Sequence, residues 1–551
     1  MRIAKWLRTV IWEHPVLWIA LGIPLFMHLS RLPDNSWNME ILIGRNLLDG
    51  FGFVSAPLDP PALWRPPLPV FVSLPIQMIT QDPLRIYAVY GTLTLLGFSL
   101  AMFYLVKMLG GPVAAHFSQL IILVTPAYTM VLNRIYTYNG YLLFLGLATL
   151  AVLTTLWSWK RVDWKRDVLS GLCWGAVFLT RPEAILLFGA GLVAYFIFHR
   201  SLGISMRMAA IGILIQGSAF LLIYAPSVTI FSRLQKKYDL IGQESLMTFY
   251  AGAHFASNQL TGDIDAEGYI ETLERYGSPA KYNYSLMRFM IAHPRAIYVR
   301  IGQNLRNFRE IILAQAMFSP WDYAAFLFAG SVLIFARPPS LPRIAIVGYS
   351  VLLLAASPYF LVFHADVRYT LMFVLMLGLF ICFTALSFWT WIGSYLRNTA
   401  KWKWLPLLPT LALIILCGQR LDTAVKTARD HTVNMQIWRD LAVSFREKLG
   451  IPGTPVVLFM GPDQTLFSGG DFLWFSYFAR TAMPWCGSPT CSAGEKTFPR
   501  DKMYSYLGKP LDYLWLPDAK LASTPPPYKL IAQHVPISSL GPYSLIEVPK
   551  H

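Results

Sequence analysis

An aspartate and an arginine near the start of the chain have the side-chain types that group transfer needs. Asp34 follows the first apolar stretch, and Arg65 comes later in Trp64-Arg65-Pro66-Pro67, where paired prolines stiffen the backbone. A carboxylate can act as a general base, and a guanidinium offers a fork of donors that matches phosphate oxygens. Asp34 is therefore a candidate base and Arg65 a candidate phosphate ligand. A helix-capping Asp34 and an interfacial Arg65 are the simpler alternatives.

The elements that position these residues are predicted to be membrane-spanning helices. The chain of 551 residues is 55% hydrophobic and 14% charged, whereas soluble domains are about 25% charged. An apolar stretch of roughly 20 residues can cross a bilayer. Eleven stretches are candidates: 10–29, 84–106, 112–131, 138–157, 168–180, 184–198, 208–228, 320–336, 344–363, 369–391 and 404–418. The fifth and sixth are short, and we keep them apart because one merged helix would bury Arg181 and Glu183.

The distribution of basic residues orients this map. With the N-terminus in the cytoplasm, fifteen lysines and arginines fall in inner segments, and three (Arg134, Arg181 and Arg368) fall in short outer loops. Cytoplasmic loops carry such an excess. Residues 1–418 are therefore predicted to form a transmembrane domain with outer loops at 30–83 and 229–319. Residues 419–551 are predicted to form an outer C-terminal domain.

The C-terminal domain mixes helix and strand patterns, which predicts a small soluble α/β domain. Residues 435–449 and 472–480 favour helices, and residues 455–460, 513–516 and 543–548 favour strands. Cys486 and Cys491 are spaced for a small disulfide loop if this domain lies in an oxidising compartment. They are a candidate disulfide, and no cysteine or histidine group has zinc-ligand spacing.

The first outer loop contains a predicted amphipathic helix. Trp37, Ile41, Gly44 and Leu48 recur at helical spacing, and Gly50 is a natural helix stop. We expect this helix to lie on the outer membrane surface, directly after Asp34.

Further polar residues are predicted at the outer ends of other spans or in the second outer loop. Arg181 and Glu183 lie between the fifth and sixth spans, and Asp366 and Arg368 lie between the ninth and tenth. Ionisable residues at a membrane boundary are costly enough to suggest function. Local ion pairs are the alternative for both pairs. His254, in the second outer loop, is either an acceptor-cleft residue or an ordinary loop histidine.

Several of these motifs together resemble the type C glycosyltransferases, in particular the protein O-mannosyltransferase and lipid A aminoarabinose transferase group. The resemblance covers roughly the first 370 residues. It rests on Asp34 at the end of a span, on Gly-Arg-Asn-Leu-Leu-Asp-Gly-Phe-Gly-Phe at 44–53, and on a basic residue before Pro-Pro-Leu. Thr-Arg-Pro-Glu at 180–183 and the acidic-x-Arg-Tyr motif at 366–369 also fit. It implies a polytopic α-helical GT-C fold with about eleven transmembrane helices and outer juxtamembrane helices.

The resemblance also implies an activity: transfer of a sugar from a polyprenyl phosphate such as undecaprenyl phosphate, outside the membrane. Asp34 would be the general base of an inverting displacement, with four residues binding the donor phosphate: Arg65, Arg181, Arg368 and Tyr369. Five others would contact the acceptor or support the site: Glu40, Asn139, Glu183, His254 and Asp366. Two positions depart from the pattern, because relatives often carry an acid near Asn139, and the aminoarabinose transferases carry one at Trp64.

The implied partners are the lipid-linked donor, a lipid, glycan or protein acceptor, and membrane lipids. No cofactor is expected, and a divalent metal is left open. Nucleic-acid binding is excluded because no basic and aromatic patch occurs on a soluble face. The expected location is a bacterial inner membrane with the C-terminal domain in the periplasm. A lipid or sugar transporter or flippase and a noncatalytic envelope scaffold are the alternative functions.

Overall fold

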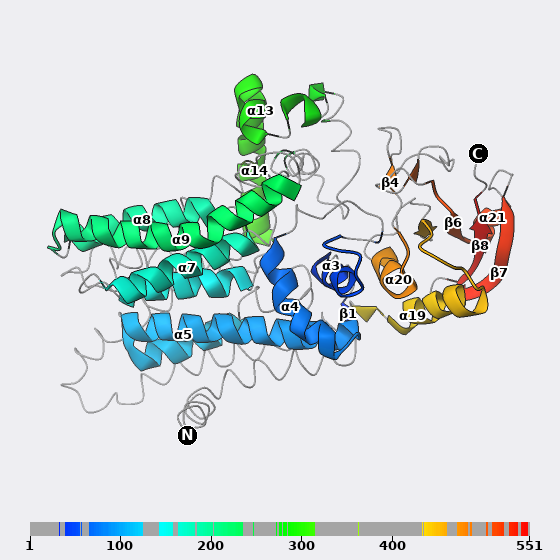
Figure 1. Ribbon diagram of the computed structural model, residues 1–551, viewed down its shortest axis with the longest axis horizontal. Helices are drawn as coiled ribbons and strands as arrows, with labels where there is room; N and C mark the ends of the chain where they lie inside the picture. Colours follow the sequence, from blue (N-terminus) through cyan, green and yellow to red (C-terminus); the bar gives the residue numbers. More distant parts are fainter. Residues whose placement is uncertain are drawn as a thin grey trace. The chain divides into compact units, whose positions relative to one another are not determined.

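The computed structural model divides into two compact units (Figure 1). Unit 1 comprises Met1–Leu29, Tyr87–Ile241 and Ile301–Asp430, and unit 2 comprises Ser30–Ile86, Gly242–Arg300 and His431–His551. Unit 2 thus gathers segments that overlap the two predicted outer loops and the predicted C-terminal domain. The structure describes residues 32–33, 39–54, 57, 66–124, 143–157, 163–181, 184–201, 203–234, 246, 249, 272, 275–277, 279–283, 285–314, 362, 432–433, 435–459, 471–482, 485–486, 503–504, 510–522, 528–537 and 541–548.

The described part of unit 1 is helical. It contains most of α5 (Pro83–Val124), a helix at Leu143–Trp157, α7 (Trp164–Thr180), α8 (Ala184–Ser201), α9 (Met206–Leu234) and the end of α14 (Pro294–Ala314). Within the described residues, two helical segments, Val89–Met108 and Met206–Ile230, are long and apolar enough to cross a membrane.

The predicted separation of the fifth and sixth stretches is confirmed. Helix α7 ends at Thr180 and α8 begins at Ala184, with the backbone of Arg181 extended between them. The predicted loop between the second and third stretches is wrong, because α5 has helical backbone through residues 107–111. Lys107, whose charge favoured a loop, stays in the helix with its ammonium 5.6 Å from the centre of the Phe103 ring.

Helices α7 and α9 pack closely against each other (Figure 1). A Cβ atom at Gly171 would stand 2.3 Å from the carbonyl oxygen of Gln216, so only glycine permits this approach. Buried Asp167 of α7 accepts hydrogen bonds from Gln216 Nε2 of α9 (3.1 Å) and from the Tyr195 hydroxyl of α8 (3.4 Å). These bonds satisfy a carboxylate that would be costly to bury alone.

The C-terminal part of unit 2 is built on a four-stranded sheet of order β3-β6-β8-β7. Strand β3 (Val457–Phe459) runs parallel to β6 (Tyr513–Pro517), and β8 (Gly541–Glu547) pairs antiparallel with β6 and with β7 (Lys529–Ile537). Helices α19 (Met435–Val443), α20 (Asp471–Ala479) and α21 (Asp518–Leu521) accompany it, and a π-helical turn, η3 (Ser444–Lys448), follows α19. The small α/β domain and its five expected elements are confirmed to within a few residues at each end.

Alternating side chains divide the core of this domain into two layers. Leu458, Leu514 and Ile546 belong to one apolar cluster of the sheet. Fully buried Trp515 has its ring centre 6.5 Å from that of Phe445 in η3 and 6.3 Å from that of Phe475 in α20. Because successive strand residues point to opposite faces, β6 serves both layers.

The described part of the second predicted outer loop is largely helical. It contains η1 (Pro279–Tyr282), α13 (Leu286–Ala292) and α14. Phe289 is fully buried among aromatic rings, and the Tyr282 hydroxyl lies 2.7 Å from His293 Nε2. Arg300 donates to the carbonyl oxygen of Phe249 at 2.8 Å.

Candidate functional site

The helix that follows Asp34 in sequence is present, and part of its predicted apolar face packs on protein. Helix α3 (Met39–Leu48) buries Ile41 and Ile43 almost completely, whereas Leu48 is 39% exposed. A Cβ atom on Gly44 would stand 2.3 Å from Gln77 Nε2 of α4 (Pro67–Ile79). The predicted helix is therefore confirmed over Met39–Leu48. Ile41 and Gly44 of its predicted apolar face pack on protein, and its place on the membrane surface stays a prediction. The face around Gly44 packs on protein, because glycine lets α4 approach closely.

The end of α3 is a Schellman-type stop at Gly50, as the sequence predicts. Gly50 has φ of +83°, the left-handed region that favours glycine, and the Phe51 amide donates to the Asn46 carbonyl at 2.9 Å. Buried Asn46 also donates from Nδ2 to the Val54 carbonyl at 2.9 Å. This bond ties the chain that leaves α3 back to the helix.

Helix α4 begins two residues after Arg65. Pro66 precedes it and Pro67 is its first residue, and neither has an N–H group. Pro69 removes another donor from the first turn. A phosphate near this helix start would therefore need donors from side chains, which is the role predicted for Arg65. Arg65 itself lies outside the described residues.

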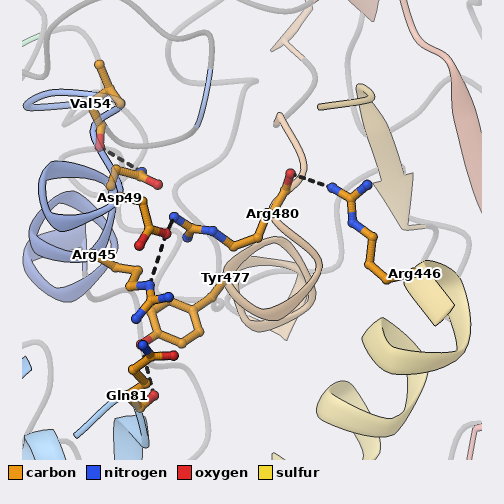
Figure 2. A network of polar contacts seen from close by, with 8 residues as sticks. Arg45, Asp49, Val54, Gln81, Arg446, Tyr477 and Arg480 are labelled. Carbon is orange, nitrogen blue, oxygen red and sulfur yellow. Dashed lines mark hydrogen bonds and ion pairs between the residues drawn. The ribbon is translucent and has the colours of Figure 1, made fainter. Parts of the chain in front are cut away.

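Asp49, at the end of α3, is shared by two arginines (Figure 2). Arg45 Nε lies 3.0 Å from Asp49 Oδ2 on the same helix, and Arg480 Nη2 pairs with the same oxygen from the end of α20. The side chains of Asp49 and Arg480 are each 23% exposed. Burial, and then the like charge of Arg45, lower the pKa of Arg480 to about 10, so Arg480 is charged at neutral pH.

Arg480 has a backbone conformation that is rare for its residue type. Its φ is +54°, and it occupies the position after α20 where glycine is usual. The Thr481 amide donates back to the Ser476 carbonyl at 3.4 Å, which closes the helix end. A left-handed residue with a side chain costs roughly 1–2 kcal/mol. The neighbouring structure must supply that stabilisation.

Arg446 of η3 supplies much of it. Its guanidinium donates to the carbonyl oxygens of Ala479, of Arg480 (2.8 Å) and of Ile451 (2.7 Å). Figure 2 shows Arg446 reaching the Arg480 carbonyl from the side opposite Asp49. Burial lowers the pKa of Arg446. One guanidinium thus fixes the turn from which the Arg480 side chain extends.

Two more contacts join the first outer loop to the C-terminal domain. The Tyr477 hydroxyl of α20 donates to the Gln81 carbonyl just beyond α4 at 3.1 Å, and burial raises the pKa of Tyr477 to about 12. Strand β1 (Leu32–Pro33), directly before Asp34, pairs antiparallel with β2 (Thr432–Val433), directly before α19. The described residues that precede and follow Asp34 along the chain, in β1 and at the end of α3, therefore both contact the C-terminal domain.

Three of the predicted site residues lie in described parts of the chain. Glu40 is half-buried in the first turn of α3, where a negative charge is favourable. Arg181 caps α7, with its amide donating to the Val177 carbonyl at 3.0 Å and its guanidinium carbon 6.0 Å from the Phe144 ring centre. Cys486 lies in β4 (Trp485–Cys486), which pairs with β5 (Met503–Tyr504). Outside the described residues lie Asp34, Arg65, Asn139, Glu183, His254, Asp366, Arg368, Tyr369 and Cys491.

Nothing in the sequence pattern indicates the contacts made by Arg446, Tyr477 and Arg480. The partner of Tyr477 lies 396 positions away along the chain, the partners of Arg446 lie 5, 33 and 34 positions away, and no periodicity connects any of them. One local signal did exist, because Arg45 and Asp49 are four residues apart within the quoted motif at 44–53. In the described residues, no group of three or more His, Cys, Asp or Glu side chains could hold a metal ion.

The comparisons with known proteins rest on structure. No protein-family model matches the chain, and no curated protein matches its sequence. ArnT from Cupriavidus metallidurans, solved with undecaprenyl phosphate bound, matches with a TM-score of 0.57 and 14% identity over 98% of this chain and 99% of that chain. The chain has the type C glycosyltransferase fold. This is a polytopic membrane fold.

The type C fold is supported by a second protein. The oligosaccharyltransferase of Archaeoglobus fulgidus, in its apo form, matches with a TM-score of 0.55 and 14% identity over 92% of this chain and 69% of that chain. Its complex with an inhibitory peptide and a dolichol-phosphate matches with a TM-score of 0.53 and 12% identity over the same shares. The resemblance drawn from the sequence motifs is therefore confirmed at the level of the fold.

Proposed function

We propose that this protein is an integral membrane glycosyltransferase that moves a sugar from a polyprenyl phosphate to an acceptor. The observation that carries the proposal is the match over nearly the whole chain to ArnT, a structure that holds undecaprenyl phosphate. The archaeal match holds a dolichol-phosphate, which is also a polyprenyl phosphate. We assign the proposed roles in the reaction to the motif residues of this chain.

Asp34 is the proposed general base. It takes the proton of the acceptor group as that group attacks the anomeric carbon of the sugar. The bond from the anomeric carbon to the lipid phosphate oxygen breaks, and the electron pair leaves with the phosphate. Because one displacement occurs, the anomeric configuration inverts. The single carboxylate fits a chain that has Asn139 where relatives often carry an acid.

The proposed donor ligands stabilise the departing phosphate. Arg65, Arg181 and Arg368 supply guanidinium donors, and Tyr369 supplies a hydroxyl. The start of α4 supports this role for Arg65, because its prolines leave few backbone donors for an anion. Glu40, Asn139, Glu183, His254 and Asp366 are assigned to the acceptor side or to support of these groups.

The proposed topology has about eleven spanning helices, a cytoplasmic N-terminus and a periplasmic C-terminal domain in a bacterial inner membrane. The positive-inside count supports this orientation through the fourteen inner lysines and arginines other than Lys107, which lies within α5. The composition of unit 2 also supports it, because the segments proposed to lie outside gather in one compact unit. The proposed reaction on the outer face then takes place at unit 2, which includes Asp34.

The direct test is donor consumption by the purified full chain in lipid nanodiscs. The probe is undecaprenyl phosphate carrying a radiolabelled sugar, presented with an envelope extract as the acceptor source. The expected result is time-dependent loss of label from the lipid, with release of undecaprenyl phosphate. Movement of intact donor between leaflets without cleavage would instead show a flippase. Lack of both activities with a panel of lipid-linked hexoses and pentoses would contradict the proposal.

A further inference from the structure

We infer that the Asp49–Arg480 ion pair is a latch through which the C-terminal domain positions the segment that carries Asp34. Asp49 and Arg480 are then positioning residues for transfer, and the C-terminal domain is part of the catalytic unit. The inference rests on the proposed function for the role of Asp34. The latch itself rests on contacts within unit 2.

The first step of the argument is the path of the chain around Asp34. Five residues, 34–38, separate the end of β1 at Pro33 from the start of α3 at Met39. Before this segment, Leu32 is paired with Val433 of β2. After it, α3 leads to Asp49 and thus to Arg480. The domain therefore pairs with the residues directly before this segment and, after it, with the far end of α3.

The second step is that α20 holds the α3–α4 pair at two places. Arg480 binds the end of α3 through Asp49, and Tyr477 binds the chain beyond α4 through the Gln81 carbonyl. Helices α3 and α4 also pack against each other, with the Gln77 side chain against Gly44. The domain therefore contacts the ends of both helices of the pair, and α3 begins at Met39, directly after the segment that carries Asp34.

The third step is the unusual backbone of Arg480. Glycine would adopt its φ of +54° without strain and would end α20 at least as well. An arginine in this position keeps the strain and gains the guanidinium that reaches Asp49. Strained residues persist where the surrounding structure holds them, as Arg446 does here through the Ala479 and Arg480 carbonyls. We infer that position 480 is an arginine for its contact with Asp49, since glycine would form the turn without strain.

The latch would affect the reaction by fixing the position of the base. A base that is displaced by about 1 Å can lose on the order of a hundredfold in rate. Within the described residues, the latch joins Arg480 and Arg45 to Asp49 at the end of α3, the helix that follows the segment of the proposed base. Loosening it should therefore lower kcat and leave the KM for the lipid-linked donor nearly unchanged.

The test uses Arg480→Gly in the full-length protein. This variant removes the guanidinium and relaxes the backbone, so a purely structural role and a positioning role predict different results. We expect the relief of the left-handed strain, together with the remaining Arg45–Asp49 pair, to offset the lost ion pair, so that the thermal midpoint stays nearly equal. We expect kcat to fall by at least about fivefold and the donor KM to stay within twofold. Arg480→Lys, which keeps the charge, should recover part of kcat. Unchanged kcat in Arg480→Gly would overturn the inference.

Amide hydrogen exchange separates the latch from the chemistry. In Arg480→Gly and Asp49→Asn, peptides covering residues 30–48 should exchange faster than in the wild type, whether or not a donor is present. Wild-type exchange in both variants would overturn the latch. Faster exchange with wild-type kcat would overturn its positioning role. If the wild-type protein transfers no sugar at all, the proposed function fails, and the exchange result still decides whether the latch exists.

Discussion

Arg480, at the end of α20, forms an ion pair with Asp49, at the end of α3, and thereby joins the C-terminal domain to the first outer loop (Figure 2). The pair is partly buried, with each side chain 23% exposed. Partly buried pairs matter more than surface pairs, since removing one partner leaves the other charge poorly solvated. The pair is thus a sensitive point of unit 2.

Replacing Asp49 by Asn should destabilise the protein more than replacing both members of the pair. Asp49→Asn leaves two arginines, Arg45 and Arg480, facing each other without a carboxylate. We expect a loss of about 1–3 kcal/mol. Asp49→Asn combined with Arg480→Gln should recover part of that loss. Thermal unfolding of both variants in the same detergent checks this, and additive effects would show that the two residues do not interact.

The coupling between Asp49 and Arg480 should not change between pH 7 and 9. Arg480 has a pKa of about 10 in the folded protein, below the ordinary value of an arginine. Between these values the unfolded chain binds more protons, so this residue's contribution to the free energy of unfolding rises with pH. Its attraction to Asp49 disappears over the same range, because the charge is lost. A double-mutant cycle repeated at several pH values measures the coupling, and a decline before pH 9 would contradict the assignment.

Gly44→Ala should force α3 and α4 apart. The added Cβ would stand 2.3 Å from Gln77 Nε2, which also donates to Ser73 Oγ at 2.9 Å. Overpacking of this kind costs about 1–3 kcal/mol. Because the clashing atom ends a flexible side chain, Gln77→Ala should relieve most of the cost. The measurement is the thermal midpoint of Gly44→Ala in the wild type and in Gln77→Ala. If Gly44→Ala lowers the midpoint equally in both, the clash with Gln77 is not the cause of the loss.

Arg446→Lys should weaken the turn that carries Arg480, although the charge is kept. A lysine cannot reproduce the planar fork that serves the Ala479, Arg480 and Ile451 carbonyls together. We expect a loss of about 1–3 kcal/mol, as for other buried polar groups that lose a partner. Adding Arg480→Gly should offset part of it, because glycine accepts the left-handed turn unaided. If Arg480→Gly gave no such compensation, Arg446 would not be supporting that turn.

The local parts of this fold could be predicted from the sequence. Gly50 ends α3, the Arg181 step separates α7 from α8, and the strand patterns at 455–460 and 513–516 identify β3 and β6. Each of these signals depends on neighbouring residues alone. The buried face of α3 could not be predicted, because hydrophobic spacing shows that a helix has an apolar side without showing what covers it. The packing of α4 near Gly44 decides that.

The candidate site divides in the same way. Side-chain type together with position was enough to select three candidates: Asp34 and Arg368 at span ends, and Arg65 before paired prolines. Those criteria could not find Arg480, because its left-handed backbone and its ion pair with Asp49 form only in the folded chain. Long-range ion pairs leave no periodic trace in a sequence.

The most direct test of the account is the rate of sugar transfer by Asp34→Asn, measured with radiolabelled undecaprenyl-phosphate sugar in nanodiscs. Asp82→Asn is the matched control, because Asp82 is an exposed carboxylate near the end of the same loop and forms an ion pair with exposed Arg85 at 3.5 Å. We predict that Asp34→Asn folds, binds the donor and transfers at most about a hundredth of the wild-type rate, within the range that a general base contributes, while Asp82→Asn transfers normally. Transfer by Asp34→Asn at the wild-type rate would contradict the role of Asp34 as the base.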